Sequence, residues 1–415
     1  MRSGEVGGID VGQLLDEVEA APPTDSVPVV AARLAEMVGA RELHFLITDF
    51  SGRAVVRLTS TARVEGARSR GAEQAETVPL TGTVYGRVLR TQQADVQQID
   101  AGARVIVPVT DRGDAIGLLE LVLPGLPTPR DVGVIETAAH ALAYVLVAAR
   151  RHTDVYEWGM RTTSFTLAAE IQRRLLPTAF TCEAGQFTLA GWLEPAAEVG
   201  GDTFDYALDR DVLHVSVTDA VGHQVAASLL ASLLVGSLRN GRRRGLDLAA
   251  QAAYANDALA EHAAPGQFVT GQLVRVDLRT GTAEVVNAGH TLPLRLRAGV
   301  VEEIRLGVEP PFGVLPGKTF QVQPLPLEAG DRIVFLTDGM LERNAASLDV
   351  AGALAQTADL HPREVVLALG AAVLQATGGD LRDDATMVCL DWYGGPPRAR
   401  DTEQGADPHR ASPSA

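Results

Sequence analysis

The hydrophobic residues of this 415-residue chain follow two different spacings, helical in some segments and alternating in others. In the first third, alternating segments come in pairs, and the polar residues 111–114 between the second pair are typical of a turn. This order predicts a small α/β domain over residues 25–150, preceded by an N-terminal arm of residues 1–24. The expected elements are a helix at 27–37 and strands at 42–49, 54–59, 103–109 and 115–123.

A helical pattern joins this domain to the rest of the chain. Hydrophobic residues recur at helical spacing from Pro129 onward and again around Ile171, and no proline interrupts them before Pro177. We therefore expect a long helix that ends in a helical linker over residues 151–178. Its hydrophobic stripe needs a partner, either the neighbouring domains or a second copy of the chain in a parallel dimer stalk.

After Pro177 the pattern changes to that of a layered domain. Runs of strands with clustered helices predict the α+β fold class, and we place this domain at residues 179–393. Residues 394–415 are rich in Pro, Gly, Ser, Arg and Asp, which predicts a disordered tail. The expected strands are at 187–191, 212–217, 267–277, 283–287, 292–297, 332–336 and 386–391, and the helices at 225–239, 246–263 and 362–377.

The composition excludes several classes of protein. The formal net charge is −16, whereas general nucleic-acid binding needs a basic surface. Cys182 and Cys389 share no short spacing, which excludes a cysteine-based zinc site. Because the N-terminus also lacks the pattern of a signal peptide, we expect a cytoplasmic protein. No hydrophobic run approaches the ~20 residues that span a bilayer, so we expect no membrane segment.

Four aspartates of the second half lie in short turns next to predicted strands. Two carboxylates about 4 Å apart repel by roughly 4 kcal/mol at an effective dielectric constant near 20, so a cluster of them needs a cation. Oxygen ligands select a hard cation such as Mg²⁺ or Mn²⁺. For Asp338 taken alone, the alternative is ordinary Asp-Gly turn chemistry. The four are Asp202 in GGDTFDY, Asp219 in VTDAVGH, Asp338 in LTDGM and Asp383 in LRDDATM.

Seven short motifs follow one another between residues 170 and 387. They are EIQRRLLP at 170–177, EPAAEVGGDTFDY at 194–206, TDAVGH at 218–223, FVT at 268–270, NAGH at 287–290, LTDGMLERN at 336–344 and DDATM at 383–387. Their order resembles the metal-dependent serine/threonine phosphatases of the PPM (type 2C-like) class, in the bacterial SpoIIE/RsbU branch. The resemblance covers about residues 166–392 and implies an α-β-β-α sandwich. The N-terminal domain, by its order of elements, resembles a GAF sensor domain.

The resemblance implies two Mn²⁺ or Mg²⁺ ions at one edge of the sandwich. Asp219 would bridge both ions, with the carbonyl oxygen of Ala220 on one of them. Asp338 and Asp383 would hold the second ion. Asp202 would bind or orient a water, with a third, weaker ion near it.

Three neighbours are assigned helper roles. Asp205 would stand behind Asp202, and Asp384 beside Asp383; because the last two are adjacent, either could be the ligand, and we favour Asp383. Gly222 would leave room for hydrated ions and a phosphate because it has no side chain.

The implied reaction is attack by a metal-activated water on a phosphoserine or phosphothreonine. Asp219 would hold the metal ions that activate the water, and His223 is the candidate general acid for the leaving oxygen. The alternative for His223 is a cap of the helix that starts near Gln224. His290 in NAGH is interpreted as a structural histidine. Gln224 departs from the branch, which has Gly there, and could change substrate access.

These inferences predict a protein serine/threonine phosphatase under the control of the N-terminal sensor. By resemblance, its substrate is a phosphorylated anti-sigma-factor antagonist in a partner-switching pathway, and it contacts neither nucleic acid nor membrane. The linker helix or the sensor domain offers a surface for a homodimer. The rival interpretation is a slow pseudo-phosphatase that acts as a partner-binding signalling module. A nucleotide cyclase is disfavoured, since GGDTF has Thr203 where the GGDEF turn needs an acidic residue.

Overall fold

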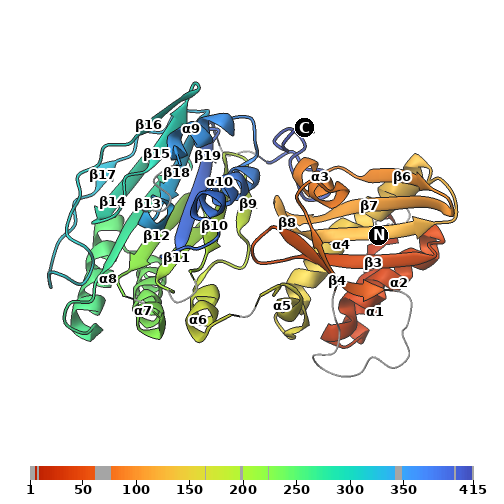
Figure 1. Ribbon diagram of the computed structural model, residues 1–415, viewed down its shortest axis with the longest axis horizontal. Coiled ribbons are helices and arrows are strands. Elements are labelled where there is room, and N and C mark those ends of the chain that lie inside the picture. The colour runs from red at the N-terminus through yellow and green to blue at the C-terminus, as the bar shows by residue number, and fades with distance from the viewer. Residues whose placement is uncertain are drawn as a thin grey trace. The chain divides into compact units, whose positions relative to one another are not determined.

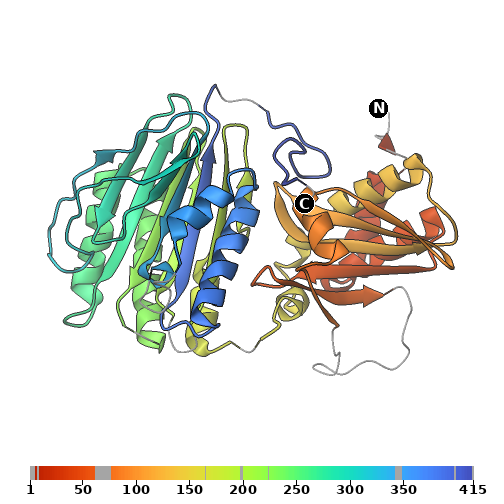
Figure 2. The ribbon, with the colours of Figure 1, turned by 45° about the horizontal axis from the view of Figure 1, so that its top comes forward.

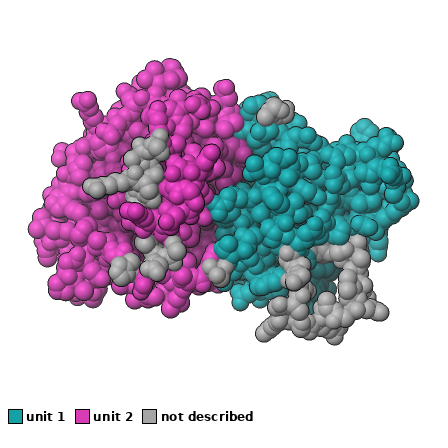
Figure 3. Space-filling view, viewed as in Figure 1, with its two compact units in different colours: residues 1–164, 401–415 teal, residues 165–400 magenta. Residues whose placement is uncertain are grey.

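The computed structural model describes residues 5–6, 9–60, 76–163, 165–196, 200–222, 224–341, 348–396 and 399–413. The chain divides into two compact units (Figure 3). Each unit has hydrophobic cores of its own. Unit 1 contains residues 1–164 and 401–415, and unit 2 contains residues 165–400. The boundary between residues 164 and 165 falls inside the predicted linker.

Unit 1 is built on a six-stranded antiparallel sheet with helices on both faces (Figure 1). The strand order is β5 (Thr77–Pro79), β4 (Ala54–Ser60), β3 (Glu42–Thr48), β8 (Asp114–Leu123), β7 (Gly102–Asp111) and β6 (Asp95–Ile99). The helices are α1 (Val11–Ala20), α2 (Ser26–Val38), α3 (Val84–Thr91) and α4 (Pro129–Ala149), with a short pair β1 (Glu5–Val6) and β2 (Ile9–Asp10) and the 3-10 turn η1 (Pro23–Asp25) before α2.

Alternation along β3 explains the two cores of unit 1. Phe45 packs on the side of α1, α2 and α4, whereas its neighbour Leu46 packs on the side of α3. Four of the expected strands lie at β3, β4, β7 and β8. The assignment of this unit as a GAF-like sensor stays a proposal.

The prediction of one long helix before unit 2 is wrong. α4 ends at Ala149, and two short helices follow, α5 (Val155–Gly159) and α6 (Leu167–Leu175). The hydroxyl of Thr166 accepts a hydrogen bond from the amide of Ala169, and this cap starts a new helix instead of continuing the previous one. The hydrophobic spacing resumes after each break, so the spacing alone does not reveal the breaks.

The hydrophobic stripe of α4 is buried inside unit 1. Ile135, Leu142 and Leu146 are fully buried in its core, so the stripe needs no second copy of the chain. Within the described part of the chain, α4 is also the one helix that is long and apolar enough to cross a membrane. The prediction that no segment has these properties is therefore wrong for α4. Half of its most apolar window is buried, as in the core helix of a globular domain.

Unit 2 consists of two stacked antiparallel sheets with helices on both outer faces (Figures 1 and 2). One sheet has the order β16 (Val300–Glu303), β15 (Leu294–Arg297), β18 (Asp331–Leu336), β19 (Ala385–Trp392), β10 (Phe187–Glu194) and β9 (Thr181–Glu183). The other has the order β11 (Asp202–Leu208), β12 (Val212–Ala220), β13 (Val269–Asp277), β14 (Ala283–Ala288) and β17 (Gln323–Pro324).

Three separate hydrophobic clusters hold these four layers together. Phe187, Phe204 and Phe335 lie between the sheets. The helices α9 (Val350–Gln356) and α10 (Pro362–Thr377) cover the six-stranded sheet, and α6, α7 (Gln224–Arg243) and α8 (Leu248–His262) lie over the five-stranded one. A short 3-10 turn, η2 (Asp338–Met340), follows β18. The layered α+β arrangement expected from the sequence is present.

The C-terminal residues differ from the predicted disordered tail. Residues 401–413 belong to unit 1. Ala406, Asp407 and Ser412 are each at most 4% exposed. Such a composition cannot build a core by itself, but it does not prevent the segment from packing on a core that already exists.

Candidate active site

Strand alternation brings two aspartates to one edge of the five-stranded sheet. On β12, Val215 and Val217 point into the core between the sheets, and Asp219 is the next residue in this alternation. On β11, Asp202 precedes the inward-facing Phe204 in the same way. Asp202 and Asp219 are register partners across the β11–β12 pair.

The six-stranded sheet supplies the opposite side of this edge. On β18, the inward-facing Phe335 is followed two residues later by Thr337. On β19, the alternation of the inward-facing Val388 extends back to Asp384, one residue before the strand. The hydroxyl of Thr337 donates a 2.7 Å hydrogen bond to Oδ2 of Asp202, which ties the two sheets together at this point.

Five aspartates gather here in an inner and an outer group. Asp202 and Asp384 are 2% and 1% exposed and form the inner group. Asp219 and Asp383 are half-buried and Asp338 is exposed, and these three form the outer group. Only the outer group is accessible to an incoming ligand.

Asp384 is held by four donors. Its Oδ1 accepts from the amide of Ala196 at 2.8 Å, and its Oδ2 accepts from the amides of Gly201 and Asp202 at 3.1 and 3.3 Å. The side chain of Gln172 donates to the same Oδ2 at 2.6 Å. These bonds occupy Asp384 in joining loops of the domain, which leaves Asp383 as the member of the pair that is available to a ligand.

Gln172 and Thr337 are site residues that the sequence reasoning missed. Gln172 lies on α6, is 1% exposed, and also donates a 2.8 Å hydrogen bond to the carbonyl oxygen of Asp202. A signal existed for Gln172, because a polar residue on the hydrophobic face of a helix in EIQRRLLP needs a buried partner. Thr337 offered no signal, since threonine is an ordinary residue at the end of a strand.

Burial is the largest cause of the raised pKa values in the cluster, and repulsion between the carboxylates adds to it. Burial and the charges of Asp338, Asp383 and Asp384 raise the pKa of Asp219 to about 7. Burial raises the pKa of Asp384 to about 6, and burial together with Asp338 raises the pKa of Asp383. Burial, Asp219 and Asp384 hold the pKa of Asp202 well above its usual range. A cation in this place would relieve the repulsion.

The donor set fits a hard divalent cation in its chemistry. All five side chains offer oxygen, and no arginine or lysine of the described residues forms an ion pair with them. As they stand, no three His, Cys, Asp or Glu side chains among the described residues are placed so that they could hold an ion. Binding of an ion would therefore require the outer carboxylates to approach one another.

Glycines let the backbone segments of the site pack closely. A Cβ atom on Gly201 would lie 2.5 Å from the carbonyl oxygen of Ala220, and one on Gly339 would lie 2.0 Å from the carbonyl oxygen of Asp384. No atom lies within 4 Å of the position that a Cβ atom on Gly222 would take, but its φ angle is 115°. This backbone conformation is one that glycine adopts far more readily than other residues. The predicted role of Gly222, to leave room for hydrated ions and a phosphate, stays a prediction.

The structure does not support the helper role predicted for Asp205. It points to the face of β11 opposite Asp202, where both its oxygens accept hydrogen bonds from Arg239 at 3.0 and 3.1 Å. Arg242 adds a contact of 3.4 Å. Alternation along the strand makes this outcome necessary, because residues 202 and 205 differ by an odd number.

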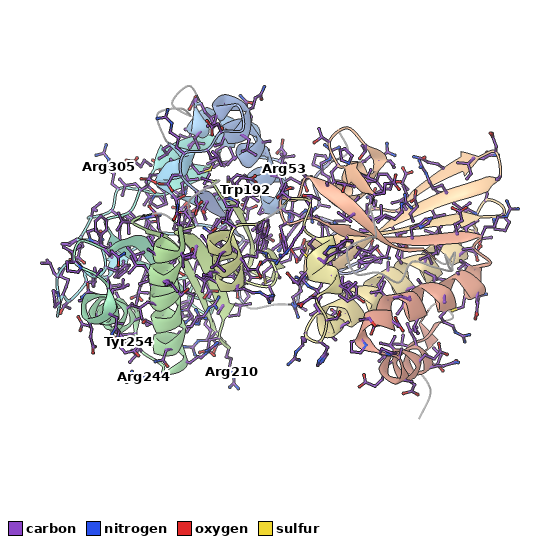
Figure 4. The ribbon with its side chains drawn as sticks, turned by 60° about the horizontal axis from the view of Figure 1, so that its bottom comes forward. Arg53, Trp192, Arg210, Arg244, Tyr254 and Arg305 are labelled. Carbon is purple, nitrogen blue, oxygen red and sulfur yellow. The ribbon has the colours of Figure 1, made fainter. Side chains whose placement is uncertain are left out.

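The basic run at residues 239–244 has specific partners within unit 2. Two of its arginines pair with Asp205, and the guanidinium of Arg244 stacks 5.3 Å from the ring centre of Tyr254 (Figure 4).

His223 lies outside the described residues. The residues beside it, Gly222 and Gln224, have positive φ angles of 115° and 59°. His290 is buried as expected of a structural histidine, and its Nδ1 lies 2.8 Å from the hydroxyl of Thr270. Burial lowers the pKa of His290 to about 4, although the nearby Leu336 carbonyl acts in the opposite direction.

Comparison with known proteins places this domain among phosphatases. Residues 209–393 match the family described as Stage II sporulation protein E (SpoIIE). A curated relative, Protein IcfG of Synechocystis sp. (strain ATCC 27184 / PCC 6803 / Kazusa), is 22% identical over 222 residues, which are 47% of this chain and 35% of the relative. The chain therefore spans about a third of the length of that relative.

Solved structures of similar domains are also known. The RsbU and RsbW domains of Rv1364c from Mycobacterium tuberculosis are 25% identical, with 51% of this chain and 62% of that chain covered and a TM-score of 0.45. The SiaA-PP2C domain of Pseudomonas aeruginosa is 22% identical, with 54% and 93% covered and a TM-score of 0.44. The family match contains Asp219, Asp338 and Asp383. Unit 2 therefore contains a region similar to the SpoIIE family over residues 209–393.

Proposed function

We propose that the protein is a Mn²⁺- or Mg²⁺-dependent phosphatase that removes phosphate from phosphoserine or phosphothreonine in another protein. The observation that carries this proposal is the outer group of Asp219, Asp338 and Asp383. These carboxylates repel one another, no arginine or lysine of the described residues neutralises them, and they lie within the SpoIIE match.

The outer group would hold the metal ions. Asp219, Asp338 and Asp383, together with the carbonyl oxygen of Ala220, would be the groups that hold the ions. Asp202 would act through water, with a third ion near it, because its Oδ2 already accepts a hydrogen bond from Thr337. When bound, the ions supply a water of lowered pKa and positive charge against the phosphoryl oxygens.

The remaining residues position this edge and move protons. Asp384, held by its four donors, fixes the backbone of residues 201 and 202 and therefore the start of β11. Asp202 is the register partner of Asp219 and would help to orient its carboxylate. We assign His223 as the group that protonates the leaving seryl or threonyl oxygen.

The substrate and the control of the enzyme are proposed from the motif order and the domain order. The substrate is a phosphorylated anti-sigma-factor antagonist of a partner-switching pathway, and unit 1 is a GAF-like sensor that regulates unit 2. A panel of phosphorylated antagonist proteins, compared with a phosphopeptide of similar charge, tests the substrate class. Equal rates on both would argue against recognition of the antagonist fold.

The activity itself is tested with a generic aryl phosphate and a phosphoprotein, each with Mn²⁺ and with a chelator. The wild type should hydrolyse both only with the metal, and Asp219→Asn should reduce the rate by roughly 10³-fold or more. Asp209→Asn is the matched control, because Asp209 is exposed in the turn between β11 and β12. Binding of phosphoprotein without hydrolysis by the wild type would instead support the pseudo-phosphatase.

A further inference from the structure

The C-terminal segment of unit 1, residues 401–413, contains a well-formed turn. Glu403 and Ala406 exchange two backbone hydrogen bonds of 2.9 and 3.0 Å. Between them, Gln404 and Gly405 have positive φ angles of 41° and 94°. This is the geometry of a type I′ turn, in which the second central residue is usually Gly. The segment therefore carries a defined local structure.

This turn docks on the turn between β7 and β8. The amide of Gly113 donates a 2.9 Å hydrogen bond to the carbonyl oxygen of Gly405. Gly113 is buried, whereas the tip of a hairpin normally faces water. A Cβ atom on Gly405 would lie 2.0 Å from the carbonyl oxygen of Thr110 and 2.9 Å from Nδ1 of His140. Glycine is thus required at position 405 by the contact as well as by the turn.

The helix α4 forms the other side of the docking surface. Nε2 of Gln404 donates a 3.2 Å hydrogen bond to Oε2 of Glu136, and the latter residue is half-buried. Burial and the carboxylate of Glu403 together raise the pKa of Glu136. The surface therefore binds the turn through a hydrogen bond and a close backbone contact, and the repulsion of two acids opposes it.

The segment is also fixed at its upstream end, within unit 2. The guanidinium of Arg400 pairs with Glu183, whose side chain is buried on β9. The other oxygen of Glu183 lies 3.1 Å from Nε2 of His361, which caps α10. Only Asp401 and Thr402 separate Arg400 from the docked turn. Both ends of this short stretch therefore have specific partners.

We propose that α4 and the β7–β8 turn form a docking site for a short acidic turn, and that its occupant is residues 401–413 of the same chain. The docked segment is held on unit 1 by noncovalent contacts, and its upstream neighbour Arg400 belongs to unit 2. Undocking breaks these contacts and leaves the chain intact. This proposal goes beyond the phosphatase activity and does not depend on it.

Hydrogen exchange at the amide of Gly113 in the full-length protein tests the proposal. The amide is protected in the wild type because it donates to Gly405, and Gly405→Ala should speed its exchange by roughly tenfold or more, since a left-handed Ala is disfavoured by about that factor. Gly395→Ala is the matched control, because Gly395 also has a positive φ (80°) but no atom within 4 Å of the added Cβ. It should leave Gly113 unchanged.

A second variant tests the same surface in the opposite direction. Glu136→Gln keeps an acceptor for Gln404 and removes the repulsion with Glu403, so exchange at Gly113 should slow by a few-fold. The amide of Leu119, in the centre of β8, reports whether unit 1 remains folded. If the Gly113 amide exchanges freely in the wild type, or is unaffected by both Gly405→Ala and Glu136→Gln while Leu119 stays protected, the docking site does not exist.

Discussion

Asp202 and Asp219 face each other as register partners across the β11–β12 pair, and the charge of Asp219 helps to raise the pKa of Asp202. Asp202 is the fully buried partner, and burial, Asp219 and Asp384 all raise its pKa. Asp219 is half-buried and belongs to the outer group. The pair thus divides into an inner acid whose charged form is disfavoured and an outer carboxylate that faces the ligand.

Replacing Asp219 by Asn should stabilise the metal-free protein. The substitution removes a carboxylate that Asp338 and Asp383 repel, and we expect a gain of about 2 kcal/mol in the free energy of unfolding near pH 8. The folded-state pKa of Asp219 is raised to about 7, so the penalty is full above that pH and disappears as the pH falls towards the unfolded value of about 4. Urea unfolding with a chelator, at both pH values, measures the effect. Asp209→Asn should change stability by less than ~0.5 kcal/mol, and a less stable Asp219→Asn protein would contradict the repulsion.

Metal binding should stabilise the wild type in proportion to the logarithm of the metal concentration. At a Mn²⁺ concentration of 100 times the dissociation constant, the expected gain is about 2.7 kcal/mol. Asp338→Asn and Asp383→Asn should each weaken this gain, whereas Asp205→Asn should not, because its carboxylate is occupied by Arg239. Thermal unfolding at several metal concentrations provides the measurement, with Ca²⁺ as a comparison ion. A metal response that is unchanged in Asp383→Asn would assign the ligand role elsewhere.

Gln172→Leu should impair the site without direct contact with substrate. The change removes a donor to Asp384 and one to the backbone of Asp202, and both acceptors are buried, so it should cost about 1–3 kcal/mol of stability. We also expect a lower kcat with little change in KM, because Asp384 fixes the start of β11. Arg174→Ala on the same helix is the control, since Arg174 is exposed and pairs only with Glu170 at its own surface. An identical loss of kcat in both variants would indicate a general effect on α6.

The strands of unit 2 could be predicted from the sequence where their inward-facing residues are hydrophobic. The strand β11, whose residues at the site are polar, could not be predicted in this way. The strands β12, β18 and β19 were expected because their inward positions are hydrophobic. β11 was missed because Asp202, Thr203 and Asp205 are polar on both faces and are typical of a loop. Their burial depends on Thr218, Thr337 and Arg239, which are distant in sequence. Propensity and periodicity contain no information on such partners.

The order of motifs identified the outer aspartates but not the division into inner and outer groups. Asp383 and Asp384 are adjacent in sequence, and only the three-dimensional structure shows that four donors hold Asp384. The tail was misjudged for a similar reason, because Gly405 is explained by a contact with Thr110, far away in the chain.

Gln224→Gly should stabilise the protein by about 0.5–1 kcal/mol. Gln224 begins α7 with a φ angle of 59°, a left-handed conformation that costs a non-glycine residue about 1–2 kcal/mol, part of which the greater freedom of an unfolded glycine offsets. Ala298→Gly is the control, because Ala298 has a φ angle of 49° in the turn between β15 and β16. Both variants should unfold at a higher urea concentration, and only Gln224→Gly should alter the kinetics. A loss of stability in Gln224→Gly would mean that its side chain contributes more than the strain costs.

Acid should destabilise the protein in part through His214. This half-buried residue lies on β12, and burial together with Arg242 and Arg275 lowers its pKa to about 4. Between about pH 6.5 and 4 the unfolded chain therefore binds a proton that the folded chain rejects, so stability falls as the pH falls through this window. From pH 7 to 5, His214→Gln should lose about 1 kcal/mol less than the wild type, once solvent screening at the half-exposed ring is included. The comparison cancels the opposite trend of the aspartate cluster, which is common to both proteins. Parallel stability curves for the two proteins would show that His214 titrates alike in the folded and unfolded states.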